Sequence, residues 1–103
     1  MKLKLVSAAL ISVVLSAGAA SVAVADEALA KKSGCLTCHS IDRKMVGPSF
    51  KSIAAADRDR DTMIHSVKKG SKGVYGKVMM PPNSPRISDE NIAKLVDFII
   101  SQK

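Results

Sequence analysis

The sequence predicts a single all-α domain, and two observations support this. Near the C-terminus, apolar residues recur with the spacing of an amphipathic helix, at positions Ile92, Leu95, Val96, Ile99 and Ile100. Nowhere do apolar and polar residues alternate over the length of a half-buried strand, and there is no internal repeat. We therefore expect several short helices and no sheet.

The first 25 residues predict a secretory signal peptide that is removed from the domain. Two lysines precede an apolar run, and the stretch ends in the small-residue triplet Ala23-Val24-Ala25. The alternative is a membrane anchor of about 20 apolar residues, but the Ala- and Ser-rich end favours cleavage. We expect a cleaved leader at 1–25, a mature domain at 26–103 with no stable membrane insertion, and export to the periplasm.

The first two helices of the mature domain are expected on either side of a short irregular segment. The first spans 26–34, with acidic residues at its start and lysines at its end that complement the helix dipole. Gly34 then permits a turn or a close approach. The second helix spans about 49–56, because Pro48 suits the start of a helix and Gly47-Pro48 breaks the preceding segment.

A third helix is expected at about 61–69, with Met63, Ile64 and Val67 on one face and Gly70 after its end. The alternating charges just before it indicate a solvated connector. Residues 71–87 contain three prolines and have no helical period, so they predict a long loop, which in a small domain usually has a function. Ser88 is the expected N-cap of the fourth helix.

The chemistry of the chain is concentrated in Cys35-x-x-Cys38-His39, the spacing by which c-type haem is attached. On one turn, both thiols can form thioethers with the haem vinyl groups, and the imidazole can bind iron. A redox disulfide or half of a zinc site are the alternatives. The chain has no further cysteine, its only other histidine is His65, and no βαβ pattern surrounds the motif. We predict one covalently bound haem c.

The size and charge of the domain fit this prediction. A domain this small rarely forms a sufficient core, and its aromatic residues are only Phe50, Tyr75 and Phe98, so the porphyrin is expected to fill the centre. The full chain carries a net charge of +7. Nucleic-acid binding is disfavoured, because the chain is exported and contains no such module. A basic face that steers an acidic redox partner and a face that merely aids solubility are about equally supported.

The second iron ligand is less clear from the residues alone. The long loop offers Met79 and Met80, and a thioether ligand that closes the iron site favours electron transfer. Met45 follows the motif too closely, and Met63 lies on a helical face where core packing is the usual role. His65 would give bis-histidine ligation, but it flanks a Lys-rich helix end and is expected to be exposed.

Taken together, the mature chain resembles a short bacterial class I cytochrome c of the c-551/c-552 type. Residues 26–103 carry the resemblance, through the haem motif, Val-Gly-Pro at 46–48, Gly-Val-Tyr-Gly at 73–76 and Met-Pro-Pro-Asn at 80–83. It implies four short helices around one haem.

The resemblance also assigns residues. It makes Met80 the distal iron ligand and Pro48 the carbonyl that accepts the Nδ1–H of His39. Tyr75 stands where the family often has a tryptophan near a haem propionate, and a tyrosine hydroxyl could make that contact. Proline is usual where Lys77 and Met79 stand, so Met79 is a competing ligand.

The predicted function is that of a soluble periplasmic electron carrier with histidine and methionine ligands, passing single electrons between redox proteins of a respiratory chain. We expect a monomer without enzymatic activity. One alternative is a haem enzyme or ligand sensor with an open or labile sixth position, such as a peroxidase. Another is a subunit or anchored domain of a larger complex, if the leader is retained.

Overall fold

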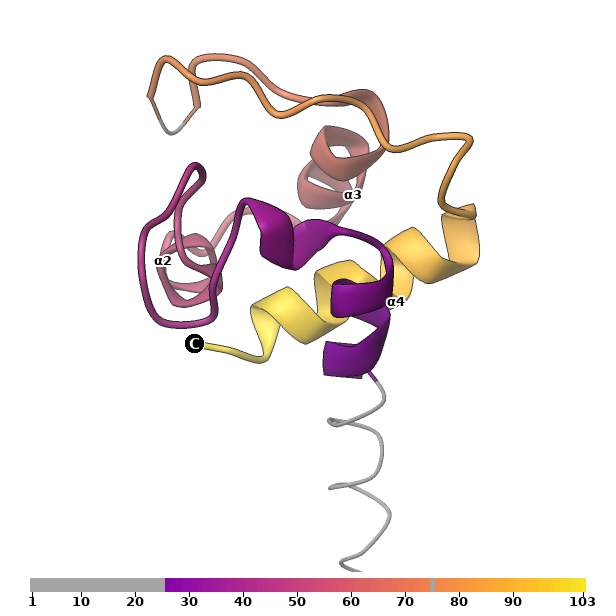
Figure 1. Ribbon diagram of the computed structural model, residues 1–103, viewed down its shortest axis with the longest axis horizontal. Coiled ribbons are helices and arrows are strands. Elements are labelled where there is room, and N and C mark those ends of the chain that lie inside the picture. Colours follow the sequence, from indigo (N-terminus) through magenta and orange to yellow (C-terminus); the bar gives the residue numbers. More distant parts are fainter. Residues whose placement is uncertain (1–25, 75) are drawn as a thin grey trace, which may run out of the picture.

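A computed structural model of the chain describes residues 26–74 and 76–103 (Figure 1). The predicted leader and Tyr75 lie outside the described residues. Within them, the first helical segment spans 26–32. It is followed by one 3₁₀ turn and three α-helices, namely η1 (Cys35–Thr37), α2 (Phe50–Ala55), α3 (Arg60–Lys69) and α4 (Asp89–Ile100). The all-α fold class is therefore confirmed.

Each of the three α-helices begins where a short polar side chain caps it. The Ser49 hydroxyl accepts a hydrogen bond from the backbone N–H of the third residue beyond it at 3.1 Å, and Asp59 and Ser88 do the same at 3.1 and 3.2 Å. These bonds satisfy N–H groups that have no partner within the helix. The observed bounds of these helices differ from the expected ones by about one residue.

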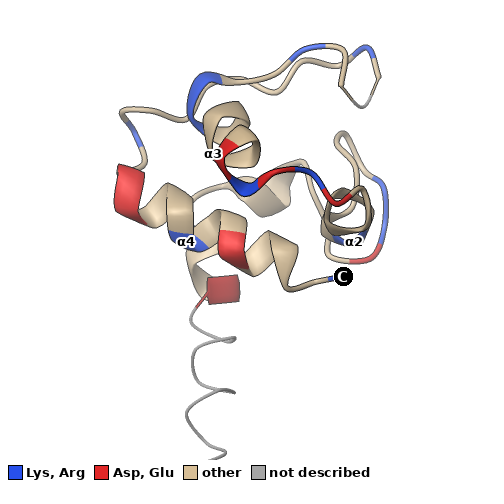
Figure 2. Cartoon of the chain, turned by 180° about the vertical axis from the view of Figure 1, so that it is seen from behind, with Lys and Arg blue, Asp and Glu red and all other residues tan. Residues whose placement is uncertain are grey.

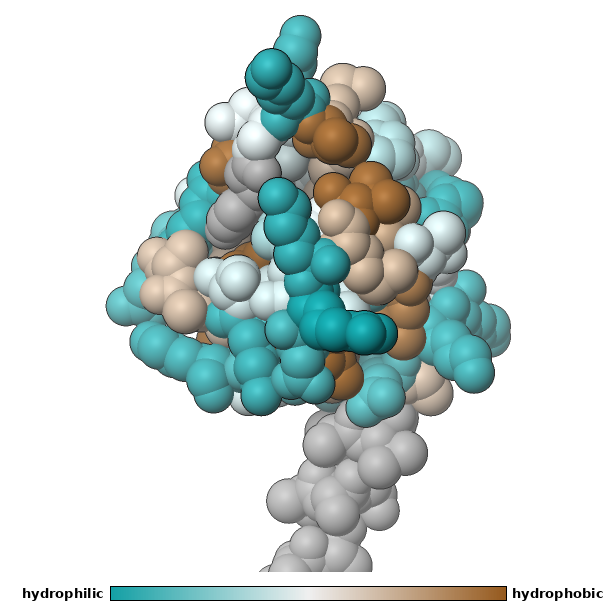
Figure 3. Space-filling model, turned by 60° about the vertical axis from the view of Figure 1, so that its left-hand side comes forward, coloured by the Kyte–Doolittle hydropathy of each residue, from teal (hydrophilic) through white to brown (hydrophobic). Residues whose placement is uncertain are grey.

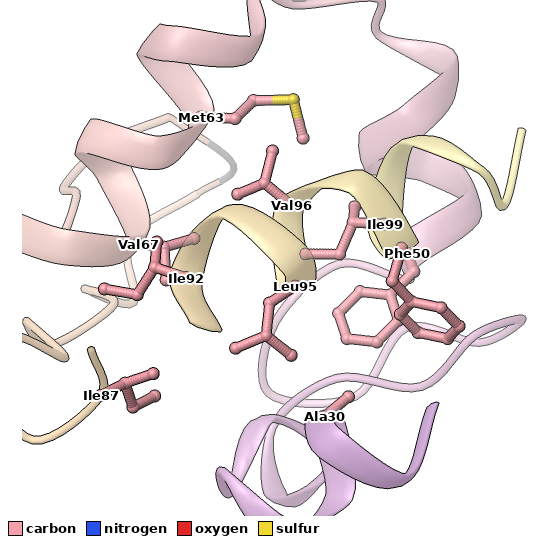
Figure 4. Packing of buried hydrophobic residues seen from close by; sticks show 10 residues of the cluster. Ala30, Phe50, Met63, Val67, Ile87, Ile92, Leu95, Val96 and Ile99 are labelled. Carbon is pink, nitrogen blue, oxygen red and sulfur yellow. The ribbon is translucent and has the colours of Figure 1, made fainter. Parts of the chain in front are cut away.

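Helix α4 forms the centre of the core and packs against both α2 and α3 (Figure 4). Its predicted apolar stripe is buried at four positions, but Ile100 is only partly buried. Phe98 is buried instead, with its ring edge-on to that of Phe50 at a centroid separation of 6.0 Å. The buried surface of α4 is thus wider than the predicted stripe, because α2 covers a second flank.

The segment between α3 and α4 is a long loop, as the sequence predicts. It extends away from the helices and returns to the start of α4 (Figure 1). An isolated bridge between Ser71 and Met80 closes its base, with two backbone hydrogen bonds of 3.1 and 2.9 Å. None of the helices in the described part of the chain is long and apolar enough to cross a membrane.

Candidate functional site

A cavity of about 570 Å³ lies between the cysteine–histidine motif and the long loop. Its volume is within the range of cofactor sites. Its walls are mainly apolar, and hydrophobic side chains gather on the face of the molecule shown in Figure 3. The core contributes to the lining through Phe50, Ile53, Met63, Val67, Leu95 and Ile99. The fold therefore leaves room for a large apolar group beside the motif.

The motif enters the cavity on a tight turn. Gly34 has a φ of 85°, and among the described residues a Cβ there would contact nothing within 4 Å beyond its chain neighbours. This glycine therefore serves the turn rather than a close approach. The 3₁₀ turn η1 follows, and the N–H of Cys38 donates to the carbonyl of Cys35 at 3.2 Å. Side chains three residues apart eclipse in a 3₁₀ turn. Both half-buried thiols consequently line the same cavity.

His39 is held by a hydrogen bond and by a ring contact. Its Nδ1 lies 2.7 Å from the carbonyl oxygen of Pro48. Because a carbonyl only accepts, Nδ1 carries the proton and Nε2 keeps the lone pair that a metal ion needs. The ring also stacks on Phe50 at 5.4 Å between centroids. The imidazole thus lines the cavity in a fixed tautomer.

Gly47 completes this support in a way that only glycine permits. A Cβ at this position would lie 2.6 Å from Cε1 and 2.9 Å from Nδ1 of His39. The backbone N–H of Gly47 donates to the carbonyl of Cys38 at 2.8 Å, which fixes the loop against the motif. The sequence marks Gly47 as a break and as part of the Val-Gly-Pro motif, but its packing against the imidazole is a finding of the structure.

The state of the cysteines bears on the alternative functions of the motif. Burial raises the pKa of the Cys35 thiol, and the positive charge of Arg86 acts in the opposite direction. A thiol with a raised pKa is a poor nucleophile, which disfavours a redox-active dithiol. Among residues 26–74 and 76–103, no three His, Cys, Asp or Glu side chains form a group that could hold a metal ion. The zinc alternative therefore lacks ligands in the described chain.

Across the cavity, the loop presents both methionines, but it holds them differently. Met80 is half-buried, packs on the edge of the core and is paired through its backbone with Ser71. Met79 also borders the cavity, but its side chain is 57% exposed. Gly70 permits the loop to pass close by, because a Cβ there would lie 2.6 Å from the Met80 carbonyl oxygen.

The other methionines and the second histidine occupy the places that the sequence suggested. Met63 is buried in the core, although it also contributes to the cavity wall, and Met45 is exposed at the rim. His65 is exposed and does not border the cavity. Tyr75, the suggested propionate contact, is outside the described residues.

The residues present fit a haem c. Two thiols and one imidazole nitrogen face the cavity from one turn, and a thioether borders it from the facing loop. Glycine is required where the imidazole is packed. An imidazole and a thioether together suit a haem iron, and the two thiols can attach the porphyrin covalently.

Two residues near the site, Asn83 and Arg86, had no role predicted from the sequence. The amide of Asn83 donates to the carbonyl of Val67 at 3.0 Å, which fastens the loop to the end of α3. Arg86 bonds to Asn83 and to the carbonyl of Ser33. The Met-Pro-Pro-Asn sequence hinted at Asn83, whereas nothing in the sequence indicated Arg86.

Known proteins resemble the chain in sequence. Residues 23–99 match the family described as cytochrome c oxidase, cbb3-type, subunit III. Cytochrome c-552 of Nitrosomonas europaea is 42% identical over 88 residues, which are 82% of this chain and 84% of the relative. Cytochrome c-551 of Pseudomonas aeruginosa is 42% identical over 82 residues, 75% of this chain and 76% of the relative.

Solved structures resemble it in fold. The crystal structure of the wild-type Nitrosomonas europaea cytochrome c552 superposes with a TM-score of 0.70 at 42% identity, covering 75% of this chain and 99% of that one. The class 1 cytochrome MtoD of Sideroxydans lithotrophicus superposes with a TM-score of 0.63 at 29% identity, covering 77% and 94%.

Proposed function

The chain belongs to the cytochrome c family that this model and these relatives define, as a class I cytochrome c of the c-551/c-552 type, and we propose that His39 and Met80 are its axial iron ligands. Members of this type are small electron carriers with one covalent haem c, and so is this protein. In our proposal, Cys35 and Cys38 form the two thioethers.

The single observation that best supports this ligation is the state of the His39 imidazole. Its Nδ1–H is used by the Pro48 carbonyl at 2.7 Å, so only Nε2 is available toward the cavity. When bound, the haem supplies an iron that accepts and releases one electron. The chain contributes the fixed imidazole, the apolar walls that exclude water, and a thioether that closes the sixth position.

The closed sixth position is the reason why we propose a carrier without enzymatic activity. A haem enzyme or sensor needs an open or labile position for its substrate or ligand. Met80 is half-buried and held by two backbone hydrogen bonds, and it borders the cavity opposite the motif. We propose that the carrier works in the periplasm after removal of residues 1–25, which fits the leader pattern in the sequence.

Absorption spectroscopy and mass spectrometry test this proposal together. The purified holoprotein should have the mass of residues 26–103 plus one haem, a low-spin spectrum and the far-red band of methionine–iron ligation. High-spin bands at rest would favour the peroxidase-like alternative. A mass that retains residues 1–25, or stable co-purification with a membrane complex, would favour a subunit of a larger assembly, as the name of the matching family model suggests.

We further propose that the partners are redox proteins of a respiratory chain and that they dock on a basic face. Between Thr62 and Ser88 the chain contains no acidic residue, and Figure 2 shows basic residues at several positions along the loop. Lys44 and Lys77 are exposed at the cavity, and Lys72 is exposed nearby. Such charges attract an acidic partner at long range.

Stopped-flow electron exchange with an acidic redox protein tests this docking face. The rate should fall as ionic strength approaches 0.1 M, where the Debye length is about 10 Å. Lys77→Gln should weaken that salt dependence more than Lys32→Gln, because Lys32 does not line the cavity. A rate that does not change with salt would instead indicate an apolar docking patch.

A further inference from the structure

Arg86 connects two parts of the chain that lie on different sides of the cavity. One guanidinium nitrogen donates to the carbonyl oxygen of Ser33 at 3.1 Å, and another donates to Oδ1 of Asn83 at 2.6 Å. Among the described residues, it is the only side chain that forms a hydrogen bond between the segment 71–87 and residues 26–48. Arg86 therefore links the long loop to the turn that carries the cysteines.

On the loop side, this contact determines which way the amide of Asn83 points. A guanidinium only donates, so the oxygen of the amide must face Arg86 and its NH₂ group must face away. That group then donates to the carbonyl of Val67 at 3.0 Å and approaches the carbonyl of Pro81 at 3.4 Å. Pro81 directly follows Met80, so the orientation of this amide bears on the backbone of the proposed iron ligand.

On the motif side, Arg86 reaches the end of the first helical segment, 26–32. The last carbonyls of a helix lack partners within it, and a positive charge there is favourable. Ser33 is 9% exposed and lies two residues before Cys35. The positive charge of Arg86 also lowers the pKa of the Cys35 thiol, although the larger effect of burial raises it.

We propose that Arg86 is a positioning residue for the redox site, which ties the Met80 loop to the Cys35 turn and places a positive charge beside the haem attachment. The inference rests on the proposed function, because it takes Met80 as the ligand. Through Asn83, the contact limits how far the loop can open. The positive charge of Arg86 also disfavours the oxidised site. The oxidised iron carries one more positive charge than the iron that has accepted an electron from the partner, so Arg86 raises the reduction potential.

The test uses the haem-loaded protein and three variants. Arg86→Gln removes the charge and the two-sided contact, whereas Arg86→Lys keeps the charge but has no planar fork to reach both acceptors. Arg60→Gln is the matched control, because it also removes one arginine charge, but from a side chain that bonds to Asp97 on α4 and not to the loop or the cysteine turn. For each protein, the reduction potential is measured, together with the rate at which added imidazole abolishes the far-red methionine–iron band.

The expected results separate positioning from general stability. Arg86→Gln should speed imidazole entry about tenfold, since a hydrogen bond to a charged group is worth roughly that factor, and it should lower the reduction potential. Arg86→Lys should speed entry while the potential stays near that of the wild type. Arg60→Gln should change neither quantity.

Three results would overturn the inference. The first is an Arg86→Gln protein that matches Arg60→Gln in both quantities, even if it unfolds at a lower temperature, because Arg86 would then only cap a helix. If Arg86→Gln fails to load haem, Arg86→Lys decides, and an unchanged rate of imidazole entry overturns the proposal. A wild-type protein without the far-red band would instead contradict the Met80 ligation, and this inference with it.

Discussion

The cysteine–histidine turn and the methionine loop face the same cavity, but the chain holds them by different means. In the turn, Cys35, Cys38 and His39 are joined by backbone bonds of 3.0–3.2 Å that span only three or four residues. The loop is fixed at its base, by the pairing of Ser71 with Met80 and by the attachment of Asn83 to α3.

The difference has a physical reason. A local turn orders few residues for each hydrogen bond that it forms, whereas a loop must be closed by contacts between distant parts of the chain, at a larger entropic cost. We therefore expect the turn to behave as the rigid side of the site and the loop as the side that can be released. The following predictions test that contrast.

The largest effect is expected from removing the attachment itself. In the double variant Cys35→Ala, Cys38→Ala, the apolar walls of the cavity of about 570 Å³ would face water. A small domain has only about 5–15 kcal/mol of folding stability to lose, so we expect a largely disordered or molten chain. Far-UV circular dichroism during heating measures this. Native-like helix content with a sharp transition in the absence of haem would show that the helices around α4 suffice.

On the loop side, Met80→Ala should abolish the far-red band while the thioethers keep the haem in place. Loss of the thioether ligand should lower the reduction potential by about 0.1 V or more, within the ~0.8 V range that axial ligands cover. We expect this effect for Met80 in particular, because Pro81 and Pro82 restrict its backbone and so reduce the entropy that the loop loses when the sulfur binds iron. Potentiometry and absorption spectra measure both changes.

Met79→Ala is the matched control for that experiment. Its side chain is 57% exposed, and neighbouring side chains in an extended segment point to opposite sides. The variant should keep the far-red band and shift the potential only modestly. The reverse pattern would identify Met79 as the ligand. Retention of the band in both variants would mean that the two methionines substitute for each other.

A smaller effect is expected from Gly47→Ala on the turn side. The new methyl group would lie 2.6 Å from the His39 ring, so the imidazole must move away from the Pro48 carbonyl. Overpacking of this kind costs about 1–3 kcal/mol. The unfolding free energy and the NMR signals of the His39 ring report the change.

Gly73→Ala separates ring displacement from backbone strain. Gly73 has a φ of +77°, so alanine there costs about 1–2 kcal/mol. Among the described residues, no atom beyond the immediate chain neighbours lies within 4 Å of the added Cβ. This variant should lose stability to a similar degree but leave the His39 signals and the potential unchanged. Equal changes in the His39 signals of both variants would show that the turn is not an independent rigid unit.

The same contrast explains what could be predicted from the sequence. The spacing of Cys35, Cys38 and His39 is local, so the turn and its chemistry follow from a few neighbouring residues. The choice between Met79 and Met80 depended on the resemblance and on the prolines, and it stays a prediction.

Three contacts between distant residues had no signal in the sequence. The bond from Arg86 to Ser33 joins positions 53 residues apart. The packing of Gly47 under the imidazole depends on how the loop folds back. Burial of Phe98 rather than Ile100 depends on the position of α2, because a helical period alone does not reveal how wide a flank the neighbouring helices cover.

The smallest expected effect concerns the scaffold beneath both regions. Arg60 on α3 forms a two-pronged contact with Asp97 on α4, at 2.7 and 3.1 Å. The hydrogen bond from Arg60 lowers the pKa of the Asp97 carboxyl, and burial acts in the opposite direction. A carboxyl whose pKa is lower in the folded than in the unfolded chain stabilises the fold at pH values above its pKa in the unfolded chain, which is about 3.9. This contribution is lost as the pH falls through the pKa of the folded chain.

Asp97→Asn should therefore lower the melting temperature slightly at neutral pH, because exposed ion pairs contribute little. The difference from the wild type should disappear in strong acid, where the wild-type carboxyl is also neutral. Thermal melts between about pH 2 and pH 7, followed both by helix content and by the far-red band, measure it. A difference that is constant over this range would mean that Asp97 acts through packing.

The order in which the two signals are lost tests a further point. If the far-red band is lost before the helices melt, and at a lower temperature in the variant than in the wild type, then removing the Asp97 carboxylate affects the methionine loop through α3 and leaves the turn unaffected. That result would identify the end of α3, where Asn83 is attached, as the support that separates the releasable side of the site from the rigid one.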